Sequence, residues 1–312
     1  MTDKTVLLSC GDALIDFVPS RLADGRDGYA PAVGGSCLNV AVAMARLGAT
    51  TGFVGGVSTD LFGEQIAAHL AASGVVPDYT RRSDHETTLA FVKMDGKDAR
   101  YAFYDETTSA RLWTYLASEV PLDKVLALHV GSVPLMNDQS GTEYEKLVAA
   151  ARGRCIVSLD PNCRPTIIKD IAAYRARIGR LAAMANIFRM SEEDFDYLYP
   201  GDVVETRAQG WLDAGVSLVI VTRGGKGATA FARSGRRDVP AGKTTVVDTI
   251  GAGDTFQGAL LVALSEAGLL QQDRLTAITG DQLAAALDFA IRAAAVTCSR
   301  PGADPPWRRE LA

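Results

Sequence analysis

The sequence has little of what disulfide frameworks and histidine metal sites require. Its five cysteines are scattered, odd in number and without any C-x-x-C spacing, so we expect reduced thiols rather than disulfides or a zinc site. Its three histidines lie far apart, and His85-Glu86 is not followed by the second histidine of a zinc-protease helix. We therefore do not expect a metal ion held by histidine.

Long apolar runs and an excess of positive charge are also missing. No apolar run approaches the ~20 residues that a membrane-spanning helix needs, and the early run Val6-Leu7-Leu8 is too short for a signal peptide. The net charge of -5 at pH 7, with no basic stripe, argues against binding to nucleic acid. We expect a cytoplasmic protein without a nucleic acid or membrane partner.

What the sequence does contain is a regular alternation of strand-like and helix-like segments. With 312 residues, 47% of them hydrophobic, the chain can bury a large core. The strand-like segments are apolar throughout, which predicts a parallel sheet covered by helices on both faces. Expected strands are 5–9, 51–57, 125–130, 155–159, 186–190 and 218–221, and expected helices are 39–47, 61–72, 142–151, 171–183 and 207–214.

Two segments depart from this alternation. Residues 14–19, followed by a polar loop from 20 to about 31, form an excursion after the first strand. Residues 87–94 and 99–104 flank Asp95-Gly96 and predict a β-hairpin. We expect both to build a small antiparallel sheet that stands at the carboxyl edge of the parallel strands as a lid over a ligand crevice. An ordinary surface hairpin is the alternative.

The stretch from Val246 to Phe256 carries the strongest chemical signal. Its two β-branched valines predict a short strand, and Gly251 and Gly253 allow a sharp turn with bare amides before an apolar helix over 257–267. The unpaired N–H groups of that helix start make the turn suitable for holding phosphate. Asp254 could accept a proton there from an attacking alcohol, or simply complement the helix dipole.

Other phosphate-binding motifs are incomplete. Gly242-Lys243-Thr244 resembles the end of a P-loop, but Arg237 stands where the opening glycine belongs. Phe256 stands where the dinucleotide fingerprint would need a third glycine after Gly251 and Gly253. A nucleotide-dependent dehydrogenase, which the alternation alone would permit, is therefore disfavoured.

Polar residues near the first strand are candidates for holding a sugar. Gly34 and Gly35 permit close approach of a ligand, and the amide of Asn39 offers both a donor and an acceptor. Asp12 and Asp16 could each accept hydroxyl hydrogens. For each of these residues a plain structural role, as turn, helix cap or polar strand end, is the alternative.

Together, the glycine pair with Asn39 and the run 248–256 resemble the ribokinase-like (PfkB) family of sugar and nucleoside kinases over essentially the whole chain. Segments 11–16, 101–104, 160–165 and 299–303 most resemble bacterial fructokinases. The resemblance implies one ribokinase-like domain over 1–312, a three-layer α/β/α fold with a mainly parallel sheet and lid segments at about 14–33 and 86–106. It also implies ATP and Mg²⁺ as cofactors.

The resemblance implies a role for each matching residue. Asp254 would deprotonate the acceptor hydroxyl, and the amides of Gly251, Ala252 and Gly253 would form the anion hole for the transferring phosphoryl group. The implied sugar-binding residues are Asp12, Asp16, Gly34, Gly35, Asn39, Tyr101, Phe103, Asn162 and Arg164. The implied nucleotide-binding residues are Ser191, Thr222, Gly224, Gly225, Gly227 and Gly253.

The resemblance also implies sites for ions, and here the sequence departs in part from the family pattern. Asp194 stands where the family often has a glutamate, and it would hold Mg²⁺ through water. Many members also bind a monovalent cation such as K⁺ beside the anion hole, for which the candidate ligands here are Asp248, Ile250, Ser299 and Gly302. Ile291 replaces an asparagine that lies near adenine in many relatives, so adenine contacts are not predicted.

We therefore expect a kinase that transfers the γ-phosphoryl group of ATP to D-fructose, giving fructose 6-phosphate. 2-Keto-3-deoxygluconate, whose carboxylate Arg164 or Arg111 could pair, is the nearest alternative acceptor, and ribose or a nucleoside follows. A catalytically inactive sugar or nucleotide sensor is an alternative from another class. The exposed lid edge would permit a homodimer, with a monomer as the alternative.

Overall fold

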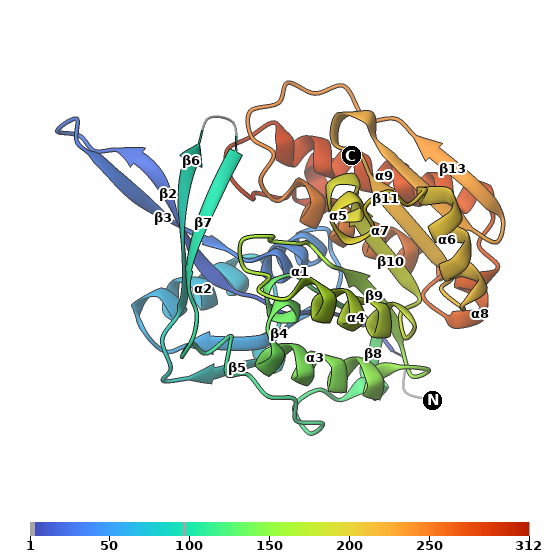
Figure 1. Ribbon diagram of the computed structural model, residues 1–312, viewed down its shortest axis with the longest axis horizontal. Coiled ribbons are helices and arrows are strands. Elements are labelled where there is room, and N and C mark those ends of the chain that lie inside the picture. Colours follow the sequence, from blue (N-terminus) through green and yellow to red (C-terminus); the bar gives the residue numbers. More distant parts are fainter. Residues whose placement is uncertain (1–3, 96–97, 312) are drawn as a thin grey trace.

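In the part of the chain that the structure describes, residues 4–95 and 98–311 without the side chains of 94–101, helices cover both faces of a nine-stranded sheet (Figure 1). This structure is a computed structural model. The strand order is β13-β12-β11-β10-β9-β8-β1-β4-β5. The strands are β1 (Val6–Cys10), β4 (Thr51–Ser58), β5 (Thr80–Ser83), β8 (Val125–Gly131), β9 (Ile156–Asp160), β10 (Ile187–Ser191), β11 (Leu218–Thr222), β12 (Ala228–Ala232) and β13 (Gly235–Val239).

The sheet is parallel from β5 to β11, as the apolar strand pattern predicted, and antiparallel at its β12–β13 edge. Successive side chains of a strand point to opposite faces, so a strand buried on both faces must be apolar at every position. Leu7 packs with one layer of helices, whereas Leu8 packs with the other.

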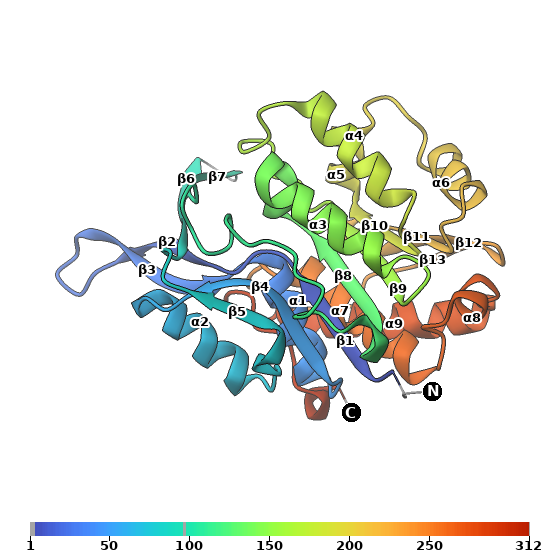
Figure 2. The ribbon, with the colours of Figure 1, turned by 90° about the horizontal axis from the view of Figure 1, so that it is seen from below.

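Helices form a layer on each side of the sheet (Figure 2). One apolar core joins α3, α4, α5 and α6 to the sheet, and two further cores join α1, α2, α7 and α9 to its other face. The helices are α1 (Ser36–Arg46), α2 (Leu61–Ala72), α3 (Asp138–Ala151), α4 (Ile171–Ala182), α5 (Glu192–Leu198), α6 (Val204–Asp213), α7 (Ala252–Glu266), α8 (Gln272–Thr276) and α9 (Gly280–Cys298). Among the described helices, none combines the length and apolar character that a membrane crossing needs.

A second, four-stranded sheet stands to one side of the main sheet (Figure 1). Its strands are β2 (Leu14–Arg21), β3 (Asp27–Gly34), β6 (Thr88–Asp95) and β7 (Asp98–Tyr104). The order is β3-β2-β6-β7, with β2 and β6 parallel and the outer pairs antiparallel. The predicted hairpin is confirmed as β6 and β7.

The prediction of a loop over residues 20–31 was wrong, because most of that segment belongs to β2 and β3. Most of β3 is exposed and lacks alternating apolar residues. Its strand conformation comes from backbone pairing with β2, in which Asp16 lies opposite Ala32. Pairing without burial leaves no periodic signal in the sequence.

The short strand predicted at Val246 and Val247 is also wrong. Both valines are exposed, at 60% and 58%, and the segment crosses the end of α9 instead of joining a sheet. The amides of Val247 and Asp248 both donate to the carbonyl of Cys298, at 2.8 Å and 3.3 Å. This contact secures the entry to the glycine turn without a neighbouring strand.

Four helices, α1, α3, α6 and α7, begin earlier than predicted, and two of them lie at the cavity. Helix α1 begins at Ser36, because the carboxylate of Asp12 accepts hydrogen bonds from the first two amides of the helix, those of Ser36 and Cys37. Helix α7 begins at Ala252, directly after Gly251 in the left-handed conformation with φ 73°. Both shifts bring helix N-termini into the crevice between the two sheets.

Candidate active site

A polar cavity of about 250 Å³ lies where the four-stranded sheet meets the carboxyl ends of the main strands. It collects residues that are far apart in the sequence. The predicted residues that line it are Asp12, Asp16, Gly35, Asn39, Phe103, Asn162, Arg164, Ile250, Gly251, Gly253 and Asp254. This cavity is therefore the candidate active site.

The carboxylate of Asp254 lies in the first turn of α7 and is buried, with 7% of the residue exposed. Its Oδ1 accepts a hydrogen bond from Ser36 Oγ at 2.6 Å, and its Oδ2 accepts one from Asn39 Nδ2 at 2.9 Å. Burial raises the pKa of Asp254 to about 6, and these two hydrogen bonds oppose the rise. A carboxylate with this pKa suits general base catalysis near neutral pH.

Helix α1 therefore holds the carboxylate of α7. The amide of Asn39, selected from the sequence as a sugar contact, here donates to Asp254. Ser36 was missed by sequence reasoning, although a hydroxyl directly after the pair Gly34-Gly35 at a helix start was a usable signal. The partnership itself could not be predicted, because 218 positions separate Ser36 from Asp254.

The turn before α7 presents free amides at the start of a helix. Gly251 is required there, because a Cβ at this residue would lie 2.6 Å from Ala303 Cβ. The Ala252 amide donates to the Thr249 carbonyl at 3.2 Å. The amides of Gly251, Gly253 and Asp254, in contrast, have no acceptor within the described chain. Free amides and the helix dipole together favour an anion at this turn.

The opposite wall of the cavity carries a second carboxylate, that of Asp16. No described group donates a hydrogen bond to it. Burial, assisted by the charge of Asp12, raises the pKa of Asp16 to about 6, whereas the charge of Arg164 lowers it. The Asp16 carboxylate is thus free to accept hydrogen bonds from hydroxyl groups.

Asp12 differs from Asp16 in having its acceptors engaged. Its carboxylate receives Ser132 Oγ at 3.0 Å in addition to the two amides at the start of α1. The space beside Asp12 and Asp16 is too small for a side chain at residues 34 and 35, which explains the two glycines there. A Cβ at Gly34 would lie 2.2 Å from Asp16 Oδ2, and one at Gly35 would lie 2.6 Å from the Asp12 carbonyl.

Arg164 provides positive charge in the cavity. Its Nη1 donates only to the backbone carbonyls of Asn162 and Cys163, at 3.2 Å and 3.0 Å, so no described carboxylate neutralises it. Asn162 has a left-handed backbone with φ 43°, and its Oδ1 is buried without a partner in the described chain. Phe103 lines the cavity from the lid. The side chain of Tyr101 lies outside the described residues.

The predicted nucleotide residues form a neighbouring group at the ends of β10 and β11. Gly224 and Gly225 lie in a 3₁₀ turn, with open space where their Cβ atoms would be. Gly227 has φ 95° and no room for a side chain, because a Cβ would lie 2.0 Å from the Val239 carbonyl. Thr222 Oγ1 accepts a hydrogen bond from Arg189 Nη2. Ile291 is buried in α9.

Ser191 and Asp194 form a capping box at the start of α5. Oδ1 of Asp194 also accepts the Cys163 amide at 2.8 Å, and burial raises the pKa of Asp194. Within residues 4–95 and 98–311, no group of three or more His, Cys, Asp and Glu residues could hold a metal ion.

The loops with the predicted K⁺ ligands lie side by side. Asp248 Oδ1 accepts the Ile250 amide at 3.0 Å, and Oδ2 accepts the Gly302 amide at 2.8 Å. Ser299 ends α9, and its hydroxyl donates to the Val296 carbonyl. Each oxygen of the Asp248 carboxylate thus accepts a backbone amide, and this residue holds the two loops together.

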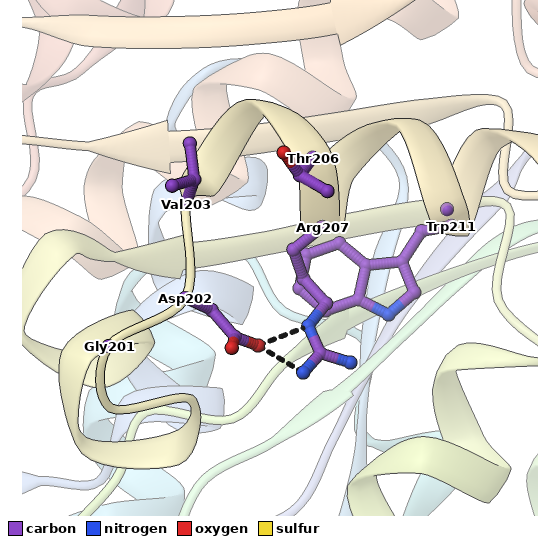
Figure 3. A pocket seen from close by; sticks show the side chains of 7 residues that line it. Gly201, Asp202, Val203, Thr206, Arg207 and Trp211 are labelled. Atoms are coloured by element: carbon purple, nitrogen blue, oxygen red, sulfur yellow. Dashed lines mark hydrogen bonds and ion pairs between the residues drawn. The ribbon is translucent and has the colours of Figure 1, made fainter.

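A larger pocket of about 560 Å³ lies elsewhere, between the end of α5 and α6 (Figure 3). Its lining includes Asp202 and Arg207, which form an ion pair, and Trp211. Arg207 also lies 4.5 Å from the centroid of the Tyr199 ring. Because these charges neutralise each other and none of the predicted site residues is present, this pocket is not the candidate active site.

The fold and the cavity define a class of protein. A buried carboxylate faces a hydroxyl-binding wall beside an amide-lined helix start, and this arrangement suits phosphoryl transfer to an alcohol. The chain belongs to the pfkB family of carbohydrate kinases, whose family model matches residues 7–309. It is therefore a carbohydrate kinase, and the expected three-layer ribokinase-like fold with a small separate sheet is confirmed.

Three relatives illustrate the similarity. A fructokinase of Rhizobium leguminosarum bv. trifolii is 38% identical over 273 residues, which cover 88% of this chain and 84% of that protein. A Xylella fastidiosa fructokinase with bound ATP aligns with a TM-score of 0.88 at 26% identity, covering 99% of this chain and 98% of that one. A Vibrio cholerae fructokinase with bound fructose, ADP and calcium ion gives a TM-score of 0.80 at 27% identity, with 96% and 94% coverage.

Proposed function

We propose that the protein transfers the γ-phosphoryl group of ATP to D-fructose, giving fructose 6-phosphate. The observation that carries the proposal is the buried Asp254 carboxylate beside free amides in a cavity with hydroxyl acceptors. The 38% identical relative is a fructokinase, and the similar solved structures contain ATP in one case and fructose with ADP in another.

In the proposed reaction, Asp16 accepts hydrogen bonds from the sugar and orients it in the cavity. Asp254, fixed by Ser36 and Asn39, takes the proton of the attacking hydroxyl. The amides of Gly251, Gly253 and Asp254 receive the phosphoryl group, and Arg164 adds positive charge. Phosphoryl transfer depends mainly on positioning and on neutralising charge, which these groups supply.

Mg²⁺ would neutralise the ATP phosphates, with Asp194 facing it through water. K⁺ would lie among Asp248, Ile250, Ser299 and Gly302, next to the anion hole. Residues 14–33 and 86–106 act as a lid within the single domain 1–312, with Phe103 above the sugar. The nucleotide lies along Ser191, Thr222 and the turn Gly224–Gly227.

The five free cysteines suit the reducing cytoplasm, where we place the protein.

2-Keto-3-deoxygluconate is the second candidate acceptor. Arg111 is not free to bind its carboxylate, because Arg111 Nη1 pairs with Asp105 Oδ2 at 2.9 Å. Arg164 has no carboxylate partner among the described residues, so it favours either an anionic sugar or the phosphates. Ribose and nucleosides follow as further candidates.

The deciding experiment measures ADP release from MgATP with fructose, 2-keto-3-deoxygluconate, ribose, glucose and adenosine. We expect turnover with fructose and a loss of about 10³-fold or more in Asp254→Ala, because the general base is removed. Turnover that survives the substitution would contradict the role of Asp254. Thermal stabilisation by one sugar without any turnover would instead support a sensor.

A further inference from the structure

Arg189, on β10, is a buried cation that the proposed reaction does not yet use. Its side chain is 5% exposed, and its Nη1 lies 2.5 Å from Oδ2 of the equally buried Asp160. Its Nη2 donates to Thr222 Oγ1 at 2.7 Å, whereas its Nε is buried without a partner in the described chain. A buried ion pair gains little net stability, because desolvation offsets the attraction. Stability alone therefore does not account for a charge at this position.

The guanidinium of Arg189 lies directly beneath the phosphate-binding turn. A Cβ on Gly253 would lie 2.9 Å from Nη2 and 3.2 Å from Nη1. The guanidinium carbon also lies 5.8 Å from the centroid of the Phe256 ring in the same helix. The amide of Gly253 is thus free, while the Cα of the same residue packs against the Arg189 guanidinium.

The charges around Arg189 keep it protonated. Burial alone would lower its pKa, but the charge and hydrogen bond of Asp160, with the charges of Asp194 and Asp254, raise it. His129 on β8 also interacts with Arg189 and Asp160, and burial, with the charge of Arg189, lowers the pKa of His129 to about 4. Because charge interactions are mutual, Arg189 favours the ionised form of Asp254, whereas Asp160 opposes it.

We propose that Arg189 is a positioning residue for phosphoryl transfer: its guanidinium supports Gly253 from below and adds a permanent positive charge behind the anion hole. This inference rests on the proposed role of the turn and of Asp254. A fixed cation in a water-excluded site requires no reorganisation during the reaction, so its effect on the transferring group exceeds that of a solvated charge. Its hydrogen bond to Thr222 also joins the anion hole to the nucleotide turn.

The test replaces the ion pair without leaving an uncompensated buried charge. In the double variant Arg189→Met with Asp160→Asn, we expect kcat to fall about 100-fold or more while the KM for fructose stays within about threefold. Arg189→Lys keeps the charge and should retain kcat within about tenfold of the wild type. The control is Arg177→Met with Glu145→Gln, an ion pair between α4 and α3 outside the cavity, whose side chains are 8% and 20% exposed. This control should lose stability but keep its kcat.

Two further readouts separate positioning from folding. The single variant Arg189→Met should move the acid limb of the kcat profile to higher pH, because Asp254 loses a cation that favours its charge. By calorimetry, the 189/160 double variant should bind a non-hydrolysable ATP analogue about tenfold more weakly, with ADP affinity changed less than twofold. The latter measurement does not require turnover.

The inference is overturned if the 189/160 double variant keeps kcat within about threefold, if Arg189→Lys is no better than Arg189→Met, or if the control loses as much kcat. Wild-type turnover with fructose and its loss in Asp254→Ala test the proposed function separately. If Asp254→Ala loses turnover but the Arg189 variants do not, the proposed function is supported and the positioning role of Arg189 is refuted.

Discussion

The two oxygens of Asp254 each accept one side-chain hydrogen bond from α1, and these donors set both the direction and the proton affinity of the carboxylate. Burial raises the pKa to about 6, and Ser36 and Asn39 moderate the rise. Without either donor the pKa would rise further, so a smaller fraction of the carboxylate would be ionised and able to accept a proton near pH 6.

We predict that Ser36→Ala shifts the acid limb of the pH–rate profile to higher pH and lowers kcat roughly tenfold near pH 6, because a charge-assisted hydrogen bond is lost. Steady-state rates from pH 5 to 9 measure this shift. Ser140→Ala is the matched control, since it removes an equally buried hydroxyl that bonds only within residues 134–140. An unchanged acid limb in Ser36→Ala would contradict the proposed control of Asp254.

Asp16 provides a test of stability against pH. Its pKa of about 6 in the folded protein exceeds the ordinary value of 3.8, so the folded state binds more protons than the unfolded state between these values. The Asp16 contribution to stability therefore falls as pH rises through this window. We predict that Asp16→Asn raises the melting temperature at pH 7 by about 2 °C, with the gain vanishing toward pH 4.

The same variant should raise the KM for fructose at least tenfold, because a carboxylate that accepts hydroxyl hydrogens is lost. Melting curves at several pH values and fructose kinetics measure the two effects. A melting temperature that is lower than the wild type at pH 7 would contradict the raised pKa of Asp16.

The sequence does not predict which individual side chains contact one another in the site. The residue types of the site could be selected from local patterns, since glycine pairs, helix starts and strand-end aspartates are visible in short windows. The pairing of each donor with its acceptor could not be predicted from local patterns, because Asn39 and Asp254 are 215 positions apart. Arg189 left one signal, a cation within an otherwise apolar strand, but its partners Asp160 and Thr222 lie on neighbouring strands.

At the scale of single elements, the start of α7 and the interior of α6 show opposite requirements for glycine. Gly253 has no room for a side chain above Arg189, whereas Gly210 lies inside α6 with open space around its Cβ position. Glycine inside a helix costs backbone entropy that alanine does not.

We predict that Gly253→Ala lowers kcat by about 10²-fold, because the turn must move away from the guanidinium and carries the anion hole with it. Gly210→Ala should leave kcat unchanged and stabilise the fold by about 0.5–1 kcal/mol. Kinetics and denaturant unfolding of both variants measure these effects. Equal rates in the two alanine variants would show that the position of the Gly253 turn does not matter.

Whether the sequence predicts an element depends on how that element is stabilised. Many buried parallel strands and amphipathic helices are encoded by periodic apolar residues, and those that were predicted lie within a few positions of the observed ones. Helices α5, α8 and α9 and the buried strand β12 were not predicted. Strand β3, and the edge strand β13 with its polar sequence Gly235–Val239, are held by backbone pairing while largely exposed. Conversely, Val246 and Val247 have strand-forming side chains but no strand beside them.

At the scale of the whole molecule, the lid sheet has edges at β3 and β7. Tyr29 and Tyr104 are exposed at 47% and 63%, and their rings each contact Phe91 on the same face. Exposed strand edges and apolar rings favour association with a second chain. We propose that two copies associate through their lids.

We predict that sedimentation detects a concentration-dependent dimer and that Tyr104→Asp shifts it toward monomer by tenfold or more in Kd, because a charge would replace an apolar contact. Tyr197→Asp, which alters a ring within α5, outside the four-stranded sheet, should leave the equilibrium unchanged. Strictly monomeric wild-type protein at all concentrations would contradict the proposal.

The contact between α1 and α7 has a consequence for how the chain matures on the ribosome. Asn39 leaves the ribosome well before Asp254, and at 5–20 residues per second the interval for 215 positions is roughly 10 to 40 s. During this time the nascent chain holds its sugar-facing residues but no catalytic carboxylate. The last-made segments therefore complete both the apolar core, through α7 and α9, and the active site, so a translation product that stops before residue 254 would lack the means to transfer phosphate.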